Sequence, residues 1–244
     1  MSRQTVRDPY RGRSPREIPA YDSFSAAHYL RIPENTIRNW AFGYAYPTRT
    51  GRRAWTKPLI DVADPARNLF SFINLVELHV LGGLRREHKV EMHKIRRAIE
   101  YLQTKLKSRH PFIDEVMETN GTDIFVDRYG ELINASQDGQ LAMKELLQSH
   151  LKRIDFDARG VAIRLFPFTR PRSNDPVVLD DAPRFIAIDP SVAFGRPVIA
   201  GSRVPTAEVF ERFKVGEQPD ELAEDFGRTK EEILEAIRCE AEAA

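Results

Sequence analysis

Two short apolar groups recur at helical spacing over residues 21–40, and a turn separates them. The first helix is expected to start at Asp22 or Ser23, which serves as its cap, and to bury Ala27 and Leu30. Ile32 and Pro33 lie in the turn. The second helix is expected to bury Ile37 and Trp40. Polar caps mark helix starts, and apolar residues three apart lie on one helix face. The segment therefore predicts a helix-turn-helix.

The second of these helices has a polar side that points away from its apolar pair. Its residues are Glu34, Asn35, Thr36, Arg38 and Asn39. Side chains of Asn, Thr and Arg form hydrogen bonds with base edges and phosphates. We therefore expect Asn35, Thr36, Arg38 and Asn39 to contact DNA, although a surface helix of an ordinary domain can have the same composition.

Residues 44–58 alternate aromatic and basic side chains around a Thr-Gly pair, which predicts a short hairpin. Its cations are Arg49, Arg52, Arg53 and Lys57. A basic hairpin beside a helix-turn-helix is a wing that contacts phosphates and adds salt-dependent affinity without sequence choice. The alternative is a solvated basic loop.

Two longer helices are predicted next. The first covers about residues 69–84, is apolar on most sides and is expected to weaken near Gly82 and Gly83. The second has one apolar stripe, made of Val90, Met92, Ile95, Ile99, Leu102 and Leu106. Such a stripe packs on the preceding helix or on a partner chain.

Residues 121–168 predict a small α+β module with the order ββαββ: a hairpin turning at Tyr129 and Gly130, a helix, and a second hairpin turning at residues 158–160. Its carboxylates Asp123, Asp127, Asp155 and Asp157 raise the question of catalysis. Aspartate is common at turns and on the polar side of strands, and no His or Cys accompanies these four at metal-ligand spacing. We therefore expect local structural roles.

Residues 169–184 are polar and rich in proline, which predicts a linker. Residues 185–244 then predict a strand pair followed by three helices. Gly201 allows the turn, Thr206 caps the first helix, Pro219 opens the second, and Thr229 with Glu232 forms a capping box for the third. The expected core of this bundle is Val209, Phe213, Leu222, Phe226, Ile233 and Ile237.

The stretch FGRPVIAGSRVPT at residues 194–206 contains two glycines and a Ser-Arg pair, as nucleotide-binding loops do, but the spacing of its glycines differs from theirs. Five residues separate Gly195 from Gly201, and Ser202 and Arg203 follow, whereas a phosphate loop has four residues between its glycines and then Lys-Ser or Lys-Thr. The dinucleotide pattern fails as well. The segment is therefore expected to serve folding and pairing.

Charge changes along the chain. Residues 1–60 have 11 Lys and Arg against 4 Asp and Glu, whereas residues 171–244 have 9 against 16. The first 20 residues, with five arginines and three prolines, predict a flexible basic arm. A basic end indicates a polyanionic partner, and an acidic end is compatible with a protein partner.

No pattern of catalytic or metal-binding residues is present. The single Cys239 excludes an internal disulfide and a Cys-rich zinc site, and His88 and His93 are five apart, which places them on different helix faces. We therefore expect no enzyme activity, no metal and no cofactor. With no apolar run of membrane length and no leader pattern, a cytoplasmic location is expected.

Two parts of the chain resemble known families. SAAHYLRIPENTIRNW at residues 25–40, the basic loop 44–58 and the helices of 69–106 resemble a MerR-type winged helix-turn-helix. Arg31 stands where that turn usually has glycine, and Pro33 stands at the usual serine cap. IDP at 188–190, GRPVI at 195–199, GSRVP at 201–205 and PDELAEDF at 219–226 resemble the C-terminal domain, formerly of unknown function, of VapB-type antitoxins. That family usually has threonine where this chain has Ser202.

The resemblance implies a type II toxin-antitoxin role, in which the protein neutralises a small PIN-like ribonuclease and represses its own operon. The fold class is then α+β, mainly α, with an N-terminal winged helix-turn-helix and helix pair (21–110), the middle module, and a strand pair with a three-helix bundle (185–244). From the charges we assign double-stranded DNA to the basic front.

For the rear we expect homodimer pairing through residues 185–204, with toxin contact there or on the middle module. The candidate partner or dimer contacts are Arg196, Val198, Ile199 and Arg203. The two arginines also have a plausible structural use. Two rival functions stay open: a stand-alone MerR-like regulator that senses a small ligand, and an enzyme such as a nuclease.

Overall fold

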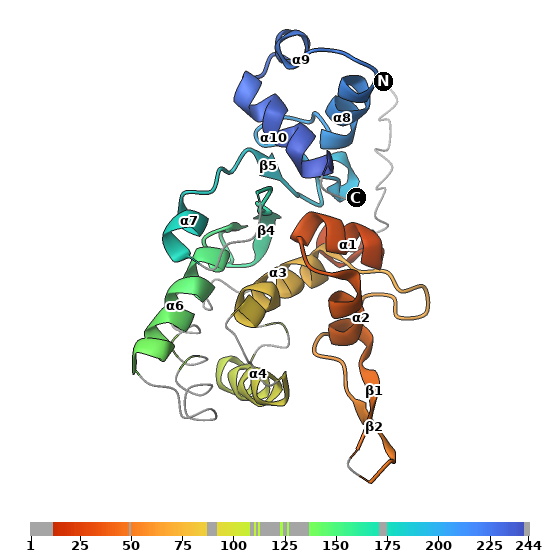
Figure 1. The fold of residues 1–244 in the computed structure, drawn as a ribbon, viewed down its shortest axis with the longest axis vertical. Coiled ribbons are helices and arrows are strands. Elements are labelled where there is room, and N and C mark those ends of the chain that lie inside the picture. The colour runs from red at the N-terminus through yellow and green to blue at the C-terminus, as the bar shows by residue number, and fades with distance from the viewer. Residues whose placement is uncertain are drawn as a thin grey trace, which may run out of the picture.

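The computed structural model describes residues 12–48, 50–86, 92–107, 110, 112, 123, 126, 137–170 and 175–241. The chain is α+β and mainly α, as predicted, with three two-stranded antiparallel sheets among the described residues. Figure 1 shows the β1–β2 hairpin at one end of the molecule and the last three helices at the other. We call residues 12–107 the head, 137–170 the middle segment and 185–241 the tail.

The head contains the predicted helices and hairpin. Its elements are η1 (Pro15–Glu17), α1 (Ser23–Leu30), α2 (Glu34–Phe42), β1 (Tyr44–Pro47), β2 (Arg53–Thr56), α3 (Phe72–Arg86) and α4 (Met92–Leu106). Ile95, Ile99 and Leu102 of the predicted apolar stripe are buried, and so is Ala98. Val90 lies outside the described residues.

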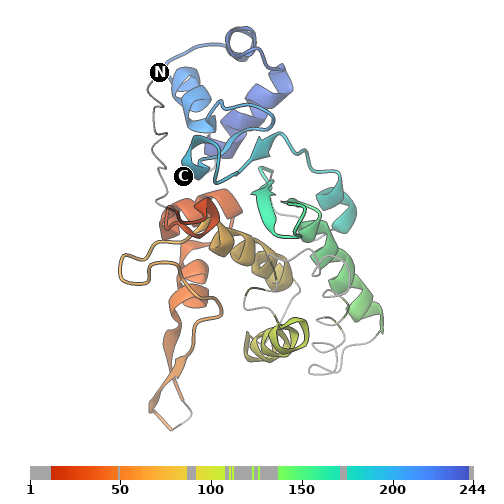
Figure 2. The ribbon, with the colours of Figure 1, turned by 180° about the vertical axis from the view of Figure 1, so that it is seen from behind.

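The middle segment contains α6 (Gln137–Leu151), β3 (Ile154–Phe156) and β4 (Ala162–Leu165). The second predicted hairpin is confirmed, whereas the first, at Tyr129 and Gly130, lies outside the described residues. Figure 2 shows α6 beside α3, and the two helices pack together. One continuous cluster of buried apolar residues includes side chains of α1, α2, α3, α4, α6, β3 and β4. Head and middle segment therefore share one core.

Glycines permit this close packing. α3 runs through Gly82 and Gly83 without a break, although glycine lowers helix propensity there. A Cβ on Gly82 would lie 2.8 Å from the Ile32 side chain, and a Cβ on Gly83 would lie 2.8 Å from the His150 ring of α6. Gly82 is a contact with the turn between α1 and α2, and Gly83 is a contact with α6, so a Cβ at either position would force the facing side chain to shift.

The basic arm is partly fixed. Residues 1–11 lie outside the described part, but Arg16 in η1 forms an ion pair with Asp157 at 2.7 Å. The backbone N–H groups of Ala20 and Tyr21 both donate to Phe70 O. The expectation of a mobile segment up to residue 20 is therefore wrong for its second half.

The predicted linker contains α7 (Pro176–Asp180). Leu179 of this helix is buried with Leu146 and Phe168. Arg153, itself buried, donates to four backbone carbonyl groups, those of Phe166, Pro167, Ala182 and Pro183. Much of the stretch between middle segment and tail is therefore tied down, contrary to the expectation of a free linker.

The tail contains β5 (Ile186–Ala187), η4 (Ala193–Gly195), β6 (Val198–Ile199), α8 (Thr206–Lys214), α9 (Pro219–Phe226) and α10 (Lys230–Ala241). It has its own core, which includes Val209, Leu222, Ile233 and Ile237 as expected. Phe213, expected there, is 38% exposed.

Two helix starts of the tail were predicted with different success. The capping box is confirmed: the Thr229 hydroxyl accepts from Glu232 N at 3.2 Å, and Glu232 accepts from Thr229 N at 2.9 Å. Thr206 is not a cap but the first residue of α8, because its buried hydroxyl bonds Pro197 O and Glu240 instead. No helix among the described residues is long and apolar enough to cross a membrane.

Candidate nucleic-acid interface

The helix-turn-helix begins with α1, whose cap is Asp22: its carboxylate accepts from Ser25 N at 2.7 Å. The buried face of α1 uses Ala26 and Leu30, while Ala27 is only partly buried. α2 turns Ile37 and Trp40 into the core, as predicted. The sequence pattern therefore located both helices and placed one buried position a residue too late.

The outer side of α2 is the candidate reading surface. Glu34, Asn35, Arg38 and Asn39 are exposed on this nine-residue helix. Thr36 is not: it is 7% exposed, and its hydroxyl accepts a hydrogen bond from Arg85 of α3. Thr36 therefore belongs to the packing of α2 and is not displayed to a ligand, contrary to the prediction.

The hairpin of residues 44–56, which we call the wing, is built as predicted. β1 and β2 pair antiparallel from Tyr44 opposite Thr56 to Pro47 opposite Arg53. Gly51 allows the turn with a φ of 77°. Arg52, Arg53 and Lys57 are exposed, whereas Arg49 lies outside the described residues. The wing also exposes Tyr44, Tyr46 and Trp55.

Two arginines behind this surface hold its parts in place, and the sequence reading missed both. Arg85 bonds Thr36 and lies 5.9 Å from the ring centroid of Trp40, so it supports α2 from α3. Arg96 of α4 donates to the backbone carbonyls of Lys57 and Pro58, at the base of the wing. Partial burial lowers the pKa of Arg96. No local sequence pattern marks Arg85 or Arg96 for these roles, because their hydrogen-bond partners lie 38 to 49 positions away in the chain.

The turn between α1 and α2 is joined to the tail. Arg31 adopts the left-handed backbone conformation, with φ 55° and ψ 39°, that glycine adopts without strain. Its guanidinium donates to the carbonyls of Arg238 at 3.0 Å and Cys239 at 3.2 Å, in the last turn of α10. His28 faces Glu240 at 3.5 Å. We call these contacts the α1–α10 clasp.

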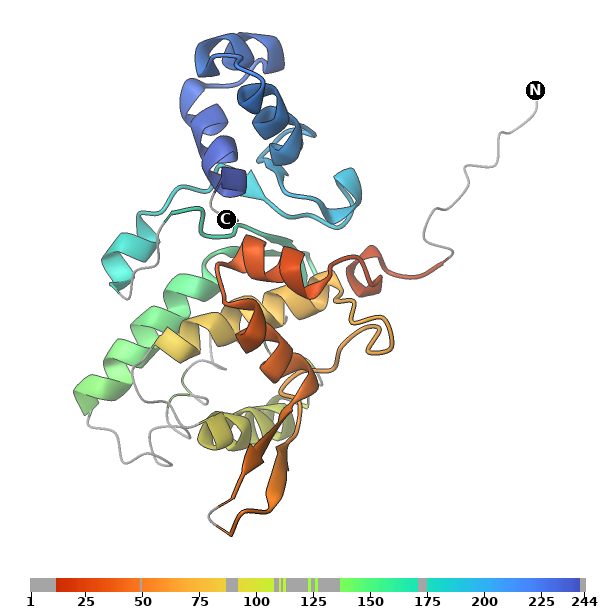
Figure 3. The same ribbon diagram turned by 45° about the vertical axis from the view of Figure 1, so that its right-hand side comes forward.

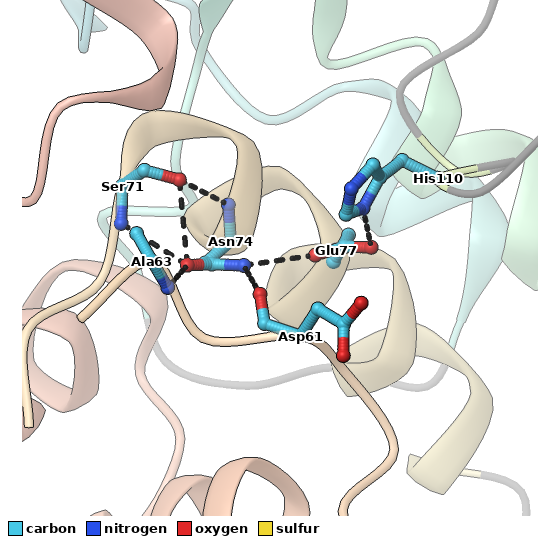
Figure 4. A network of polar contacts seen from close by, with 6 residues as sticks. All are labelled: Asp61, Ala63, Ser71, Asn74, Glu77 and His110. Atoms are coloured by element: carbon cyan, nitrogen blue, oxygen red, sulfur yellow. Dashed lines mark hydrogen bonds and ion pairs between the residues drawn. The ribbon is translucent and has the colours of Figure 1, made fainter. Parts of the chain in front are cut away.

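A buried polar network fixes the start of α3 (Figure 4). The Asn74 side-chain oxygen accepts from Ser71 and from Ala63 N, and its amide donates to Asp61 O and to Glu77. His110 bonds the other Glu77 oxygen at 2.8 Å. These groups hold the segment that follows the wing against α3, which gives them a structural use.

The acidic residues weighed for catalysis have local partners. Asp155 pairs with Arg164 at 3.2 Å, and Asp123 pairs with Lys144 at 2.6 Å. The hydrogen bond from Arg16 lowers the pKa of Asp157 to about 2. Asp127 lies outside the described residues, as does His88.

Metal-ligand clusters were sought in the part of the chain that the structure describes. No group of three or more His, Cys, Asp or Glu side chains there is arranged to hold a metal ion. Cys239 is buried, and desolvation raises the pKa of its thiol to about 12.

The four tail residues expected at a partner interface divide into two pairs. Val198 and Ile199 form β6, pair with β5 of the same chain and are buried in the tail core, so their side chains do not face a partner. Arg196 and Arg203 are exposed. Apolar strand residues read alike whether they pack within a chain or between chains, which is why the prediction failed for the first pair.

Two family models match parts of the chain. A "Putative DNA-binding HTH domain" matches residues 19–99, which is nearly the whole head. A second model, described as "Protein of unknown function (DUF433)", matches residues 186–238, which make up most of the tail. The helix-turn-helix head is therefore found both by family model and by geometry.

Relatives from Mycobacterium tuberculosis (strain ATCC 25618 / H37Rv) match over most of their length. "Putative antitoxin VapB45" is 27% identical over 239 residues, covering 91% of this chain and 93% of that protein. "Uncharacterized protein Rv2308" is 27% identical over 214 residues, covering 85% and 84%. The X-ray crystal structure of Rv2018 from the same species has a TM-score of 0.64 at 22% identity, covering 90% of this chain and 98% of that one. The chain thus combines a helix-turn-helix head with a DUF433-like tail, in an arrangement of the same fold as Rv2018, and it is similar along 91% of its length to a protein described as an antitoxin.

Proposed function

We propose that this protein is the antitoxin of a type II toxin-antitoxin pair, which binds its own promoter and neutralises a PIN-like ribonuclease. Similarity to an antitoxin along most of the chain supports the general role. The PIN-like character of the toxin, repression of the shared operon and a homodimeric state are further parts of the same proposal. The protein itself is proposed to have no catalytic activity and no cofactor.

The observation that carries the DNA half is the pairing of two exposed surfaces on the head. α2 presents Asn35, Arg38 and Asn39, and the adjacent wing presents Arg52, Arg53 and Lys57. Amide and guanidinium groups on a short helix suit base edges in the major groove, while wing cations suit the flanking phosphates. We therefore assign sequence choice to α2 and salt-dependent affinity to the wing.

The tail is proposed to meet the toxin and not the DNA. Residues 171–244 have 16 Asp and Glu against 9 Lys and Arg, so a duplex approaching the three-helix bundle would meet like charge. Several tail cations are already paired within the bundle, among them Arg212 with Glu217 and Asp225, and Lys230 with Asp220. These pairs leave less positive charge for phosphate.

The test is co-expression with the protein encoded by the neighbouring gene, which the proposal expects to be the ribonuclease, followed by affinity capture and a gel shift on the promoter. The double variant Arg38→Ala with Asn39→Ala removes two exposed side chains of α2. Since each good base contact contributes about 1–3 kcal/mol, operator affinity should fall at least about tenfold while capture of the ribonuclease is unchanged. Lys214→Ala, a tail cation on α8, is the matched control and should leave both readouts unchanged.

A loss of capture with intact operator binding in the α2 double variant would reverse the assignment of head and tail. Operator binding without capture of any neighbouring nuclease by the unaltered protein would favour the stand-alone regulator. Arg53→Ala should weaken binding to all sequences equally and lower the slope of log affinity against log salt by about 1. Light scattering of the purified chain tests the homodimer.

A further inference from the structure

The turn η4 holds three consecutive residues in the left-handed region. The φ angles are 47° at Ala193, 57° at Phe194 and 78° at Gly195. Glycine adopts this conformation freely, whereas each residue with a Cβ is strained there. Two adjacent strained residues in a three-residue turn mark a backbone that its surroundings hold in place.

Contacts from all three parts of the protein hold the turn. The Tyr21 hydroxyl of the head donates to Gly195 O at 2.8 Å, and a Cβ on Gly195 would lie 2.2 Å from that hydroxyl oxygen. Arg164 of the middle segment pairs with Asp189 at 3.3 Å. The other carboxylate oxygen of Asp189 accepts from Ser191 N and Oγ, at 2.9 and 2.5 Å. The turn is therefore tied to the head directly, through Tyr21, and to the middle segment through Asp189, which precedes it.

What this turn presents is an aromatic ring. Phe194 is 72% exposed, the most exposed aromatic side chain of those that the structure describes. Figure 3 shows η4, in light blue, projecting from the tail on the side away from α7. Burial of a Phe side chain stabilises a fold, and this turn leaves the Phe194 ring in solvent while its backbone is also strained. Neither property helps the isolated chain to fold.

The charged residue nearest to the ring in sequence is an arginine. Residues 190–207 contain no Asp or Glu and two arginines, Arg196 and Arg203, both of which are exposed. Asp189 and Glu208 bound this stretch, and Arg196, two positions from Phe194, presents an exposed cation close to the apolar ring. Its complement is an apolar pocket with a carboxylate rim, since aromatic and arginine side chains are the usual anchors at the centre of protein interfaces.

We propose that η4 is the docking anchor for the partner protein: the Phe194 ring enters an apolar pocket of the partner, and Arg196 and Arg203 face acidic groups around it. The proposal rests on the antitoxin function above and names the surface that the ribonuclease contacts. A protein partner fits better than a duplex, because the tail has 16 Asp and Glu against 9 Lys and Arg over residues 171–244 and would repel phosphates.

The test compares two polar substitutions of exposed apolar residues in the tail. Phe194→Asn removes the ring and suits a left-handed backbone, so Tm should not fall. Its Kd for the adjacent ribonuclease, measured by calorimetry with the full chain, should rise about 30-fold, the effect of losing an aromatic anchor. Val215→Ser is the matched control, since Val215 is 80% exposed, and it should change the Kd less than twofold.

Each outcome decides something. If Phe194→Asn binds the ribonuclease as tightly as the unaltered chain, the anchor is refuted while the antitoxin role stands. If the unaltered chain itself fails to bind the ribonuclease, both proposals fail together. A loss of promoter binding with unchanged ribonuclease affinity would make η4 a DNA contact, and a fall in Tm would make the ring a folding element; either result overturns the anchor.

Discussion

Arg31 allows the strain of one backbone position to be separated from the contacts of its side chain. Its backbone is left-handed at the end of α1, and its guanidinium bonds two carbonyls in the last turn of α10. Arg31→Ala removes the guanidinium and keeps the strain, because alanine also has a Cβ. Arg31→Gly removes the guanidinium and relieves the strain.

The magnitudes follow from these two terms. Loss of charged hydrogen bonds to carbonyls is expected to destabilise both variants by about 2–3 kcal/mol. In the glycine variant, relief of the left-handed strain raises the free energy of unfolding by about 1–2 kcal/mol. The larger chain entropy of glycine in the unfolded state lowers it again by about 0.4–1 kcal/mol. Arg31→Gly should therefore be more stable than Arg31→Ala by about 1 kcal/mol, and both should be less stable than the unaltered protein.

Urea unfolding at neutral pH measures the difference as a change of midpoint, provided that the slope m is the same for all chains. Arg203→Ala serves as the control, because it removes an exposed tail arginine outside the clasp and should change stability by less than about 0.5 kcal/mol. An alanine variant at least as stable as the glycine variant would refute the assignment of strain to Arg31. A glycine variant as stable as the unaltered chain would refute the clasp.

Three further outcomes are expected. Because the hydrogen bond from Arg16 lowers the pKa of Asp157 to about 2, this pair stabilises the fold above about pH 4 and the effect is lost as pH falls toward 2; Asp157→Asn should remove that part of the acid dependence of Tm. Cys239, with its thiol pKa raised to about 12 by burial, should react with a thiol reagent only on unfolding, and fast reaction of the native chain would contradict its burial. Gly83→Ala should lower stability by about 1 kcal/mol in urea unfolding, since the new Cβ meets the buried His150 ring; a gain, as in an open helix, would show that the helices move apart freely.

Local patterns predicted the elements that local chemistry determines. The spacing of Ile37 and Trp40 located α2, the Gly51 turn located the wing, and Thr229 with Glu232 located the start of α10. In each case the residues that carry the signal are within a few positions of the structure they specify. The same is true of the exposed Asn and Arg side chains on the outer face of α2.

Contacts between distant residues were not predictable from the same patterns. From the sequence, Thr36 is expected at the surface because it is polar. In the structure Arg85, 49 positions later, bonds its hydroxyl and helps to cover it. Gly83 reads as a weak point until the α6 histidine lies against it. Val198 is recognisable from the sequence as an apolar strand residue. No local pattern shows whether its side chain packs within this chain or against a second copy. These three cases share one cause, since tertiary packing decides whether a side chain is covered.

The clasp also bears on how the protein is made. Arg31 and the Cys239 carbonyl that it bonds are 208 positions apart, so a growing polypeptide has its first helix-turn-helix long before the clasp can close. At the 5–20 residues per second of synthesis, the interval is on the order of ten seconds or more. During that time the Arg31 guanidinium lacks the two carbonyl groups that it bonds in the folded chain, and the left-handed turn forms without them.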